Sequence, residues 1–193
     1  MDIFTNILSA FGLSASAGLN AYIPLLTVAL LAKYTKLIQL NETWEPMTSW
    51  WVIGVLIFLS LIEFFADKIP AVNHVNDAIQ TFIRPAAGAI VFAATSTQGV
   101  EVSPMLSLIA GLLVAGGVHA VKALAIRPAV TATTGGIANV GVSVAEDITS
   151  TAVSFLSIIL PVIIACVLVL ITALIIIRIF KKHREQEEND TLV

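Results

Sequence analysis

Hydrophobic residues run through almost the whole chain in blocks long enough for membrane helices, and polar positions fall mainly between the blocks. The first block, residues 3–32, is interrupted near Gly18 by small and polar residues. We therefore expect a broken helix there, with pieces at 3–13 and 20–32, since glycine and proline weaken a helix interior. After a polar loop, a second apolar block predicts a spanning helix over 50–66.

The next part of the chain is less uniformly apolar. Within 71–84, an apolar stripe at helical spacing opposes a polar stripe formed by His74, Asp77, Thr81 and Arg84. This pattern predicts an amphipathic helix that either lies in the membrane interface or lines a polar cavity. Residues 85–97 predict a separate short helix, which is too short to cross a bilayer alone as one straight helix.

Three further segments follow. A helix is predicted over 105–126, where Gly111 and Ala115 have the small-xxx-small spacing that allows helices to approach closely. Residues 128–145 are small, weakly apolar and rich in glycine, so we expect a broken or re-entrant segment. A last helix is predicted over 151–178.

The charges after the last helix predict an orientation. Arg178, Lys181, Lys182 and Arg184 follow it directly, which places the C-terminus in the cytoplasm by the positive-inside rule. Residues 181–193 are expected to form a charged cytoplasmic tail.

Composition places the chain in the membrane. Hydrophobic residues make up 58% and charged residues only 12%, whereas soluble domains are about 25% charged. We expect one all-α polytopic domain with about five to six membrane segments. The net charge of −3 argues against nucleic acid as a partner. One cysteine and scattered histidines predict no metal site, no cofactor is expected, and no catalytic motif appears.

Two matching runs stand out, because each reads hydroxyl-Ala-hydroxyl-x-Gly and is followed by an asparagine. In transporters with internal repeats, matched interruptions of two apolar segments point to the binding site. The alternative is ordinary close packing of helices through small residues. A central substrate-binding site is predicted from the polar members of both runs: Ser14, Ser16, Asn20, Thr131, Thr133 and Asn139.

A second pair of runs, Ile-Arg-Pro-Ala, contains Arg84 and Arg127. Since proline is favoured at the first position of a helix, each arginine is predicted to precede a helix N-terminus. Such a terminus together with a guanidinium suits a phosphate or carboxylate, which predicts an anion site used twice. The alternatives are pairing with local carboxylates and contact with lipid headgroups. The two pairs of runs do not share one register, so an inverted internal repeat is only suggested.

Other ionisable residues fall in or beside the apolar blocks. Glu63 and Asp67 share a helix face and could couple transport to protons or cations, or simply mark an interfacial helix end beside Lys68. Asp77 could pair with Arg84.

His119 and Lys122 share a face predicted to pack toward other helices, although a lysine there could also extend to the interface. Glu146 and Asp147 either join the polar network or favour the N-terminus of the last helix.

Several runs together resemble one family. The chain is similar to the small bacterial multi-pass membrane proteins grouped as domain of unknown function 4126. The resemblance covers about residues 8–150 and implies a multi-pass protein of the bacterial inner membrane, with no functional residues to transfer. It rests on Ser14–Pro24, Asp67–Pro70, Thr81–Pro85 with Gly88, and Arg127–Asp147.

These observations favour a small secondary transporter or permease for an anionic solute or lipid, coupled to protons or sodium, and no enzyme. The alternatives are an ion channel and a lipid-binding or scaffolding protein without transport. Membrane lipids and a second copy of the chain, most simply in a dimer, are the expected partners.

Overall fold

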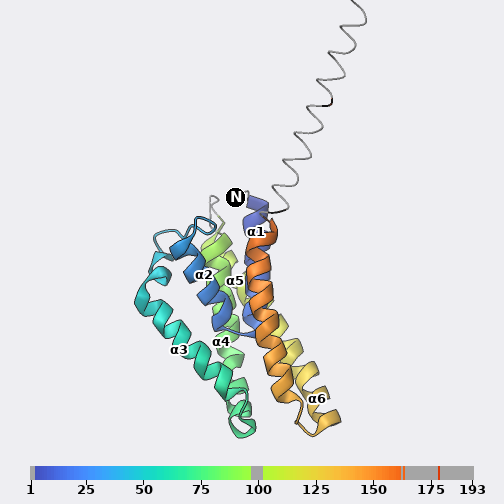
Figure 1. The fold of residues 1–193 in the computed structure, drawn as a ribbon. Coiled ribbons are helices and arrows are strands. Elements are labelled where there is room, and N and C mark those ends of the chain that lie inside the picture. Colours follow the sequence, from blue (N-terminus) through green and yellow to red (C-terminus); the bar gives the residue numbers. More distant parts are fainter. Residues whose placement is uncertain (1–2, 97–101, 162, 164–177, 179–193) are drawn as a thin grey trace, which may run out of the picture. The chain divides into compact units, whose positions relative to one another are not determined.

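The computed structural model describes residues 3–96, 102–161, 163 and 178, and every regular element in this part of the chain is helical. The predicted all-α class is confirmed. A last helix, Asn139–Pro161, follows a glycine turn (Figure 1). The elements before it are α1 (Ile3–Leu19), α2 (Tyr22–Tyr34), the short η1 (Glu45–Thr48), α3 (Trp50–Ala66), α4 (Pro70–Ser96), α5 (Pro104–Val121), η2 (Lys122–Ile126) and α6 (Arg127–Thr134).

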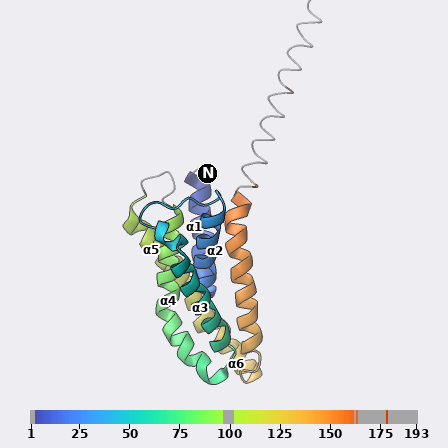
Figure 2. The same ribbon diagram turned by 60° about the vertical axis from the view of Figure 1, so that its left-hand side comes forward.

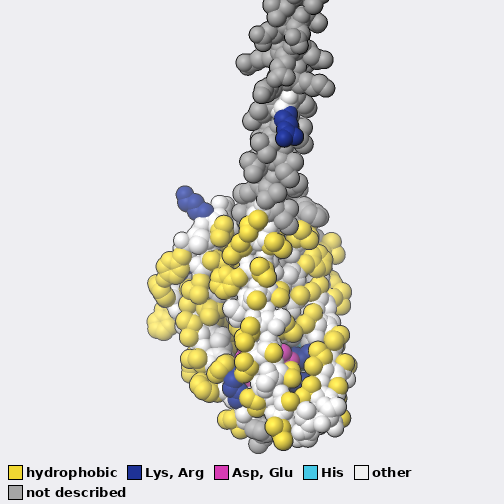
Figure 3. Space-filling view, turned by 45° about the vertical axis from the view of Figure 1, so that its right-hand side comes forward, with side chains coloured by type: hydrophobic (Ala, Val, Ile, Leu, Met, Phe, Trp, Pro, Cys, Tyr) yellow, Lys and Arg dark blue, Asp and Glu magenta, His cyan; other side chains and the backbone are white. Residues whose placement is uncertain are grey.

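Three of the described helices are long and apolar enough to cross a membrane: Asn76–Ser96, Pro104–Thr134 and Asn139–Pro161. The helices α2 and α3 are apolar but shorter, so the predicted count of five to six segments stays a prediction. The surface agrees with a membrane environment, because the face in Figure 3 carries mostly hydrophobic side chains with few charges between them. The protein is therefore a membrane-spanning helical protein.

The core lies where α1, α4 and α5 pack against one another. In Figures 1 and 2 these helices run side by side, α2 lies beside α1, and α3 slants across one flank. Residues 1–158 form one compact unit, which contains all the side chains discussed below.

Small residues allow this close packing. A Cβ atom at Gly88 of α4 would lie 2.9 Å from the carbonyl oxygen of Gly111 on α5, and one at Gly18 of α1 would meet the carbonyl of Ala115. Substitution at these glycines would therefore force the helices apart. The predicted close approach through Gly111 and Ala115 is found in the structure.

The first block is broken at a different place from the one predicted. Helix α1 continues through Gly18 to Leu19, and the break falls at Asn20 and the following alanine. Asn20 Oδ1 accepts hydrogen bonds from the backbone N–H groups of Tyr22 and Ile23, both at 3.1 Å, which stabilises the start of α2. Pro24 lies in the first turn of α2, where its missing N–H costs nothing.

The two helices predicted at 71–84 and 85–97 form one continuous helix, α4, with Pro85 inside it. The prediction that Pro85 starts a helix is wrong. Proline is tolerated inside membrane helices because neighbouring helices and hydroxyl side chains compensate for the lost backbone hydrogen bond. Its neighbour Arg84 is thereby held in mid-helix.

The second Arg-Pro run does not start a separate helix either. The elements α5, η2 and α6 form one uninterrupted helical run over Pro104–Thr134, about 46 Å long at 1.5 Å per residue. The turns of η2 are π-helical and end just before Pro128. A π-turn widens the helix, which relieves the clash of a proline ring with the carbonyl one turn earlier.

The segment predicted to be broken at 128–145 does contain an interruption. Helix α6 ends at Gly135 and Gly136, which have φ angles of 62° and 88°. Only glycine adopts such angles without strain. The next helix begins at Asn139 rather than at the predicted residue 151. Most of 162–178 and the tail 181–193 lie outside the described residues.

Candidate functional site: a buried charge network

Eight ionisable side chains from six helical segments meet inside the unit. We refer to them as the charge network. Seven are less than a tenth exposed, and the eighth, Asp77, has a side chain that is 23% exposed. The members are Glu63 and Asp67 at the end of α3, Asp77 and Arg84 on α4, His119 on α5, Lys122 on η2, Arg127 on α6, and Glu146 on the last helix.

Arg84 forms the deeper half of the network. Its Nη2 donates to Glu63 Oε1 at 2.8 Å and lies 3.9 Å from Asp67 Oδ2. The two acids are one turn apart, so both face the same guanidinium. Arg84 and Glu63 are each only 1% exposed, and a buried charge in a membrane protein requires such a partner.

The hydrogen bonds of His119 define its tautomer. Arg84 Nη1 lies 3.3 Å from His119 Nδ1, and because a guanidinium only donates, Nδ1 must accept. The proton of the neutral ring is then on Nε2, which lies 3.2 Å from the Thr81 hydroxyl. Thr81 donates its own proton to the carbonyl of Asp77, so its oxygen is free to accept from His119.

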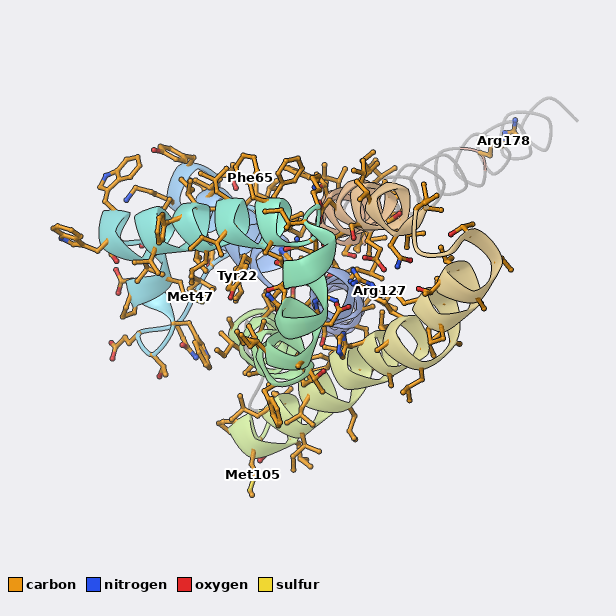
Figure 4. The ribbon with its side chains drawn as sticks, turned by 90° about the horizontal axis from the view of Figure 1, so that it is seen from below. Tyr22, Met47, Phe65, Met105, Arg127 and Arg178 are labelled. Atoms are coloured by element: carbon orange, nitrogen blue, oxygen red, sulfur yellow. The ribbon has the colours of Figure 1, made fainter. Side chains whose placement is uncertain are left out.

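Arg127 forms the second half of the network and contacts three carboxylates. Its Nη1 donates to Asp77 Oδ2, and its Nη2 lies 3.3 Å from Glu146 Oε2 and 3.5 Å from Asp67 Oδ2. Asp67 therefore bridges the two arginines. Figure 4 shows Arg127 pointing into the middle of the bundle.

Lys122 completes this half. Its Nζ lies 2.7 Å from Glu146 Oε2 and donates to the carbonyl of Leu19 at 3.3 Å. With 1% side-chain exposure, Lys122 does not extend to the interface. The alternative in which Glu146 caps a helix end is also wrong, because this residue lies inside helix Asn139–Pro161.

The network carries one more negative than positive charge. Its four carboxylates face the two guanidinium groups and the ammonium of Lys122, and His119 is neutral. Among the described residues, one oxygen each of Glu63, Asp77 and Glu146 has no hydrogen-bond partner. Since unpaired buried acceptors are costly, this arrangement favours the uptake of a proton, a cation or water.

A smaller ion pair lies beside the network. Lys68 Nζ is 3.6 Å from Asp147 Oδ2, and Asn20 Nδ2 donates to Asp147 Oδ1 at 3.0 Å. Lys68 therefore pairs with Asp147 and not with its neighbour Asp67. Asp147, like Glu146, lies within the last helix rather than before it.

The first hydroxyl run serves helix packing. Ser14 Oγ donates to the carbonyls of Gly111 and Gly88, at 2.8 and 3.2 Å. Ser16 Oγ lies 2.7 and 2.8 Å from the hydroxyls of Ser150 and Ser154 on the last helix. The alternative of close helix packing is thus the one found for this run.

The second hydroxyl run lies on an exposed hairpin. Thr131 and Thr133 are exposed, and Asn139 donates to Thr131 across the glycine turn at 3.0 Å. Thr133 bonds back to its own helix. The structure therefore does not bring the two runs together into the predicted central site, because the first run is sealed between helices.

Asp77 pairs with Arg127 and not with Arg84, although it was predicted to share a face with the latter. Both arginines bind carboxylates of the chain, as one alternative held. The role of Arg84 and Arg127 in anion binding stays a prediction.

Two contributors were missed at the sequence level. Asn76 Nδ2 donates to Asp67 Oδ1 at 2.7 Å, and Ser143 Oγ accepts from Arg127 at 3.1 Å. A helical stripe of Ser143, Glu146, Ser150 and Ser154 signals the second of these. That stripe becomes visible only when the last helix is started at 139.

The described residues offer no ready set of metal ligands. Among the described residues, no group of three or more His, Cys, Asp or Glu side chains could hold a metal ion. Each carboxylate of the network instead pairs with an arginine or a lysine.

The fold and the network together define a class: membrane-spanning helical proteins with ion pairs inside the bundle. The particular family follows from a family model described as a domain of unknown function, DUF4126, which matches residues 7–182. The chain belongs to this family. No curated protein and no solved structure matches it.

Proposed function

We propose that this protein is a small secondary transporter for an anionic solute, in which the anion competes with Asp77 for Arg127. The observation that carries the proposal is the charge network itself. Three paired cations and three carboxylates are buried in a membrane-spanning unit, with the partly exposed Asp77 beside them. Intramembrane ionisable groups of this kind mark transport pathways and proton relays.

The Arg127 half is the better candidate for substrate contact. Asp77 is the most exposed of the network carboxylates, at 23% of its side chain, whereas Glu63 is at 1%. A phosphate or carboxylate that replaced Asp77 would accept the charge-assisted hydrogen bond that Arg127 Nη1 donates to Asp77 Oδ2. Ser143 Oγ, 3.1 Å from Arg127 Nη2, offers a hydroxyl beside it.

Charge balance supplies a coupling mechanism. The network already has a surplus of one negative charge. A substrate anion that enters it increases this surplus, which is unfavourable for buried groups. A proton on Asp77 would release Arg127 and neutralise the displaced carboxylate at the same time. One proton moved with each charge of the anion keeps the network at its resting charge, which is the stoichiometry of proton-anion symport. Sodium bound near the same carboxylates would balance the charge equally well.

The experiment is uptake into liposomes that contain the purified full chain. The probes are inorganic phosphate and short mono- and dicarboxylates, each tested under an imposed pH gradient, a sodium gradient, or no gradient. We expect gradient-driven accumulation of at least one probe. Arg127→Lys, which keeps the charge but loses the fork, should reduce uptake by a chain that still folds and reconstitutes.

Three outcomes would overturn this proposal. Conductance without coupled accumulation would indicate a channel. No flux of any probe under any gradient would favour a lipid-binding or scaffolding role. Uptake that is the same in the wild type and in Arg127→Lys would show that transport does not use the network.

A further inference from the structure

An apolar groove lies beside the charge network and takes no part in it. Helix α2, helix α3 and the last helix form its walls, and its volume is about 660 Å³. The side chains that line it are mostly aliphatic or aromatic, with Leu26, Ile57, Leu61, Phe64, Ile148 and Ala152 contributing. Pockets that hold small molecules have volumes of roughly 300–1,000 Å³, so the groove has the size for a ligand and is small for a packed helix.

The groove opens onto the surface that contacts lipid. On α3 the neighbouring Phe58 and Phe65 are 63% and 61% exposed, and on the last helix Leu156 is 55% exposed. Figure 4 shows Phe65 at the outer edge of the bundle. Large exposed apolar side chains on membrane helices face hydrocarbon. A ligand can therefore enter the groove sideways from the bilayer. The groups most abundant at that opening are the acyl chains of lipids.

The inner side of the groove is polar. Asn20, Ser60 and Asp147 all line it. Asp147 Oδ1 accepts from Asn20, but its Oδ2 has no hydrogen-bond donor among the described residues, and neither does the hydroxyl of Ser60 have a partner there. A serine in a membrane helix normally bonds to its own backbone, so the unpaired Ser60 hydroxyl points to a ligand.

Charge complementarity defines the headgroup. Lys68 Nζ lies 3.6 Å from Asp147 Oδ2, at the same end of the groove, and rests 3.1 Å from the centre of the Phe64 ring. Lys68 and Asp147 lie side by side, so they match a zwitterionic headgroup whose negative group faces Lys68 and whose positive group faces Asp147. A primary ammonium can donate to Asp147 Oδ2, which is ion-paired with Lys68 but accepts no hydrogen bond from the described residues, and a phosphate can accept from Lys68 and Ser60.

We propose that this groove binds one acyl chain of a membrane phospholipid whose headgroup carries both a phosphate and a primary amine, as in phosphatidylethanolamine. The ammonium lies on Asp147 and the phosphate on Lys68. A trimethylated amine, as in phosphatidylcholine, cannot donate a hydrogen bond and binds more weakly. This site is independent of the proposed transport function, because it does not use the network.

The test is native mass spectrometry of the full chain in detergent with equal amounts of dioleoyl phosphatidylethanolamine and dioleoyl phosphatidylcholine. Ala152→Trp fills the groove, and Leu156→Trp, one turn further along and outside the groove, is the matched control. We expect one retained phosphatidylethanolamine per chain in the wild type and the control. Ala152→Trp should lower its retention about tenfold, which corresponds to the loss of a modest binding energy.

Asp147→Asn provides a second, milder variant. It keeps the shape of the side chain and removes the charge, so the preference for the amine headgroup should fall by about threefold while one acyl chain still binds. Equal retention in Ala152→Trp and Leu156→Trp, or an unchanged headgroup preference in Asp147→Asn, would overturn the proposal. A dimer that forms through this groove without lipid would also do so. Liposome uptake by Ala152→Trp reports separately on the transport function.

Discussion

The two Ile-Arg-Pro-Ala runs have the same sequence but place their arginines in different surroundings. Arg84 is sealed, with Glu63 beside it and 1% exposure for both side chains. Arg127 reaches Asp77, whose side chain is 23% exposed. The difference teaches that the motif does not by itself determine the surroundings of its arginine. The neighbouring helices make Arg84 a structural lock and leave Arg127 beside a partly exposed carboxylate.

The largest effect on the free energy of unfolding is expected from removing Arg84, in the fully buried half of the network. Arg84→Met leaves the Glu63 carboxylate buried without its partner and should lower the free energy of unfolding by about 3–5 kcal/mol. Reversible unfolding in bicelles measures this change. The double variant Glu63→Leu with Arg84→Met removes both charges and should recover most of the loss. A single variant as stable as the wild type would contradict the role of Arg84 as a structural lock.

A smaller loss is expected for Arg127. Its acidic partners Asp77 and Glu146 have side chains that are 23% and 10% exposed. Water can therefore solvate these carboxylates when the guanidinium is removed. Arg127→Met should lower the free energy of unfolding by about 1.5–3 kcal/mol, the range for hydrogen bonds to charged groups. The same unfolding assay checks it. A loss larger than that of Arg84→Met would reverse the comparison between the two halves.

Substitutions in the two hydroxyl runs are expected to change the free energy of unfolding least. Here too, residues of the same motif lie in different surroundings. Ser14 bonds to α4 and α5 and is fully buried, whereas Thr133 is exposed and bonds only within its helix. Ser14→Ala should lower the free energy of unfolding by about 0.6–1 kcal/mol, and Thr133→Ala should change it by less than about 0.5 kcal/mol. Equal losses in the unfolding assay would show that the two runs do not differ as described.

Hydropathy and composition were sufficient to predict the all-helical membrane class and the helix over residues 50–66, and the spacing of small residues predicted the close approach at Gly111. They failed where tertiary contacts override local signals. Pro85 looked like a helix start, yet the surrounding helices allow α4 to continue through it. The start of the last helix was missed because Gly135 and Gly136 were counted as part of a longer broken segment.

The members of the network were predicted individually, and their partners were not. Lys68 was one candidate partner of Asp67, but Asp67 bridges two arginines and accepts from Asn76. Spacing along one helix shows which residues share a face. It does not show which face of another helix lies opposite, so pairings such as Lys122 with Glu146 require the assembled bundle.

The central claim, that an anion competes with Asp77 for Arg127 when Asp77 takes up a proton, is tested most directly with Asp77→Asn. This variant resembles the protonated carboxyl group and cannot release a proton. Uptake of the anionic probe into liposomes is measured for the wild type and the variant, with and without an imposed pH gradient. We predict that the wild type accumulates the probe only under the gradient, and that the variant equilibrates it equally well in both conditions. Accumulation by Asp77→Asn that still follows the pH gradient would contradict the account.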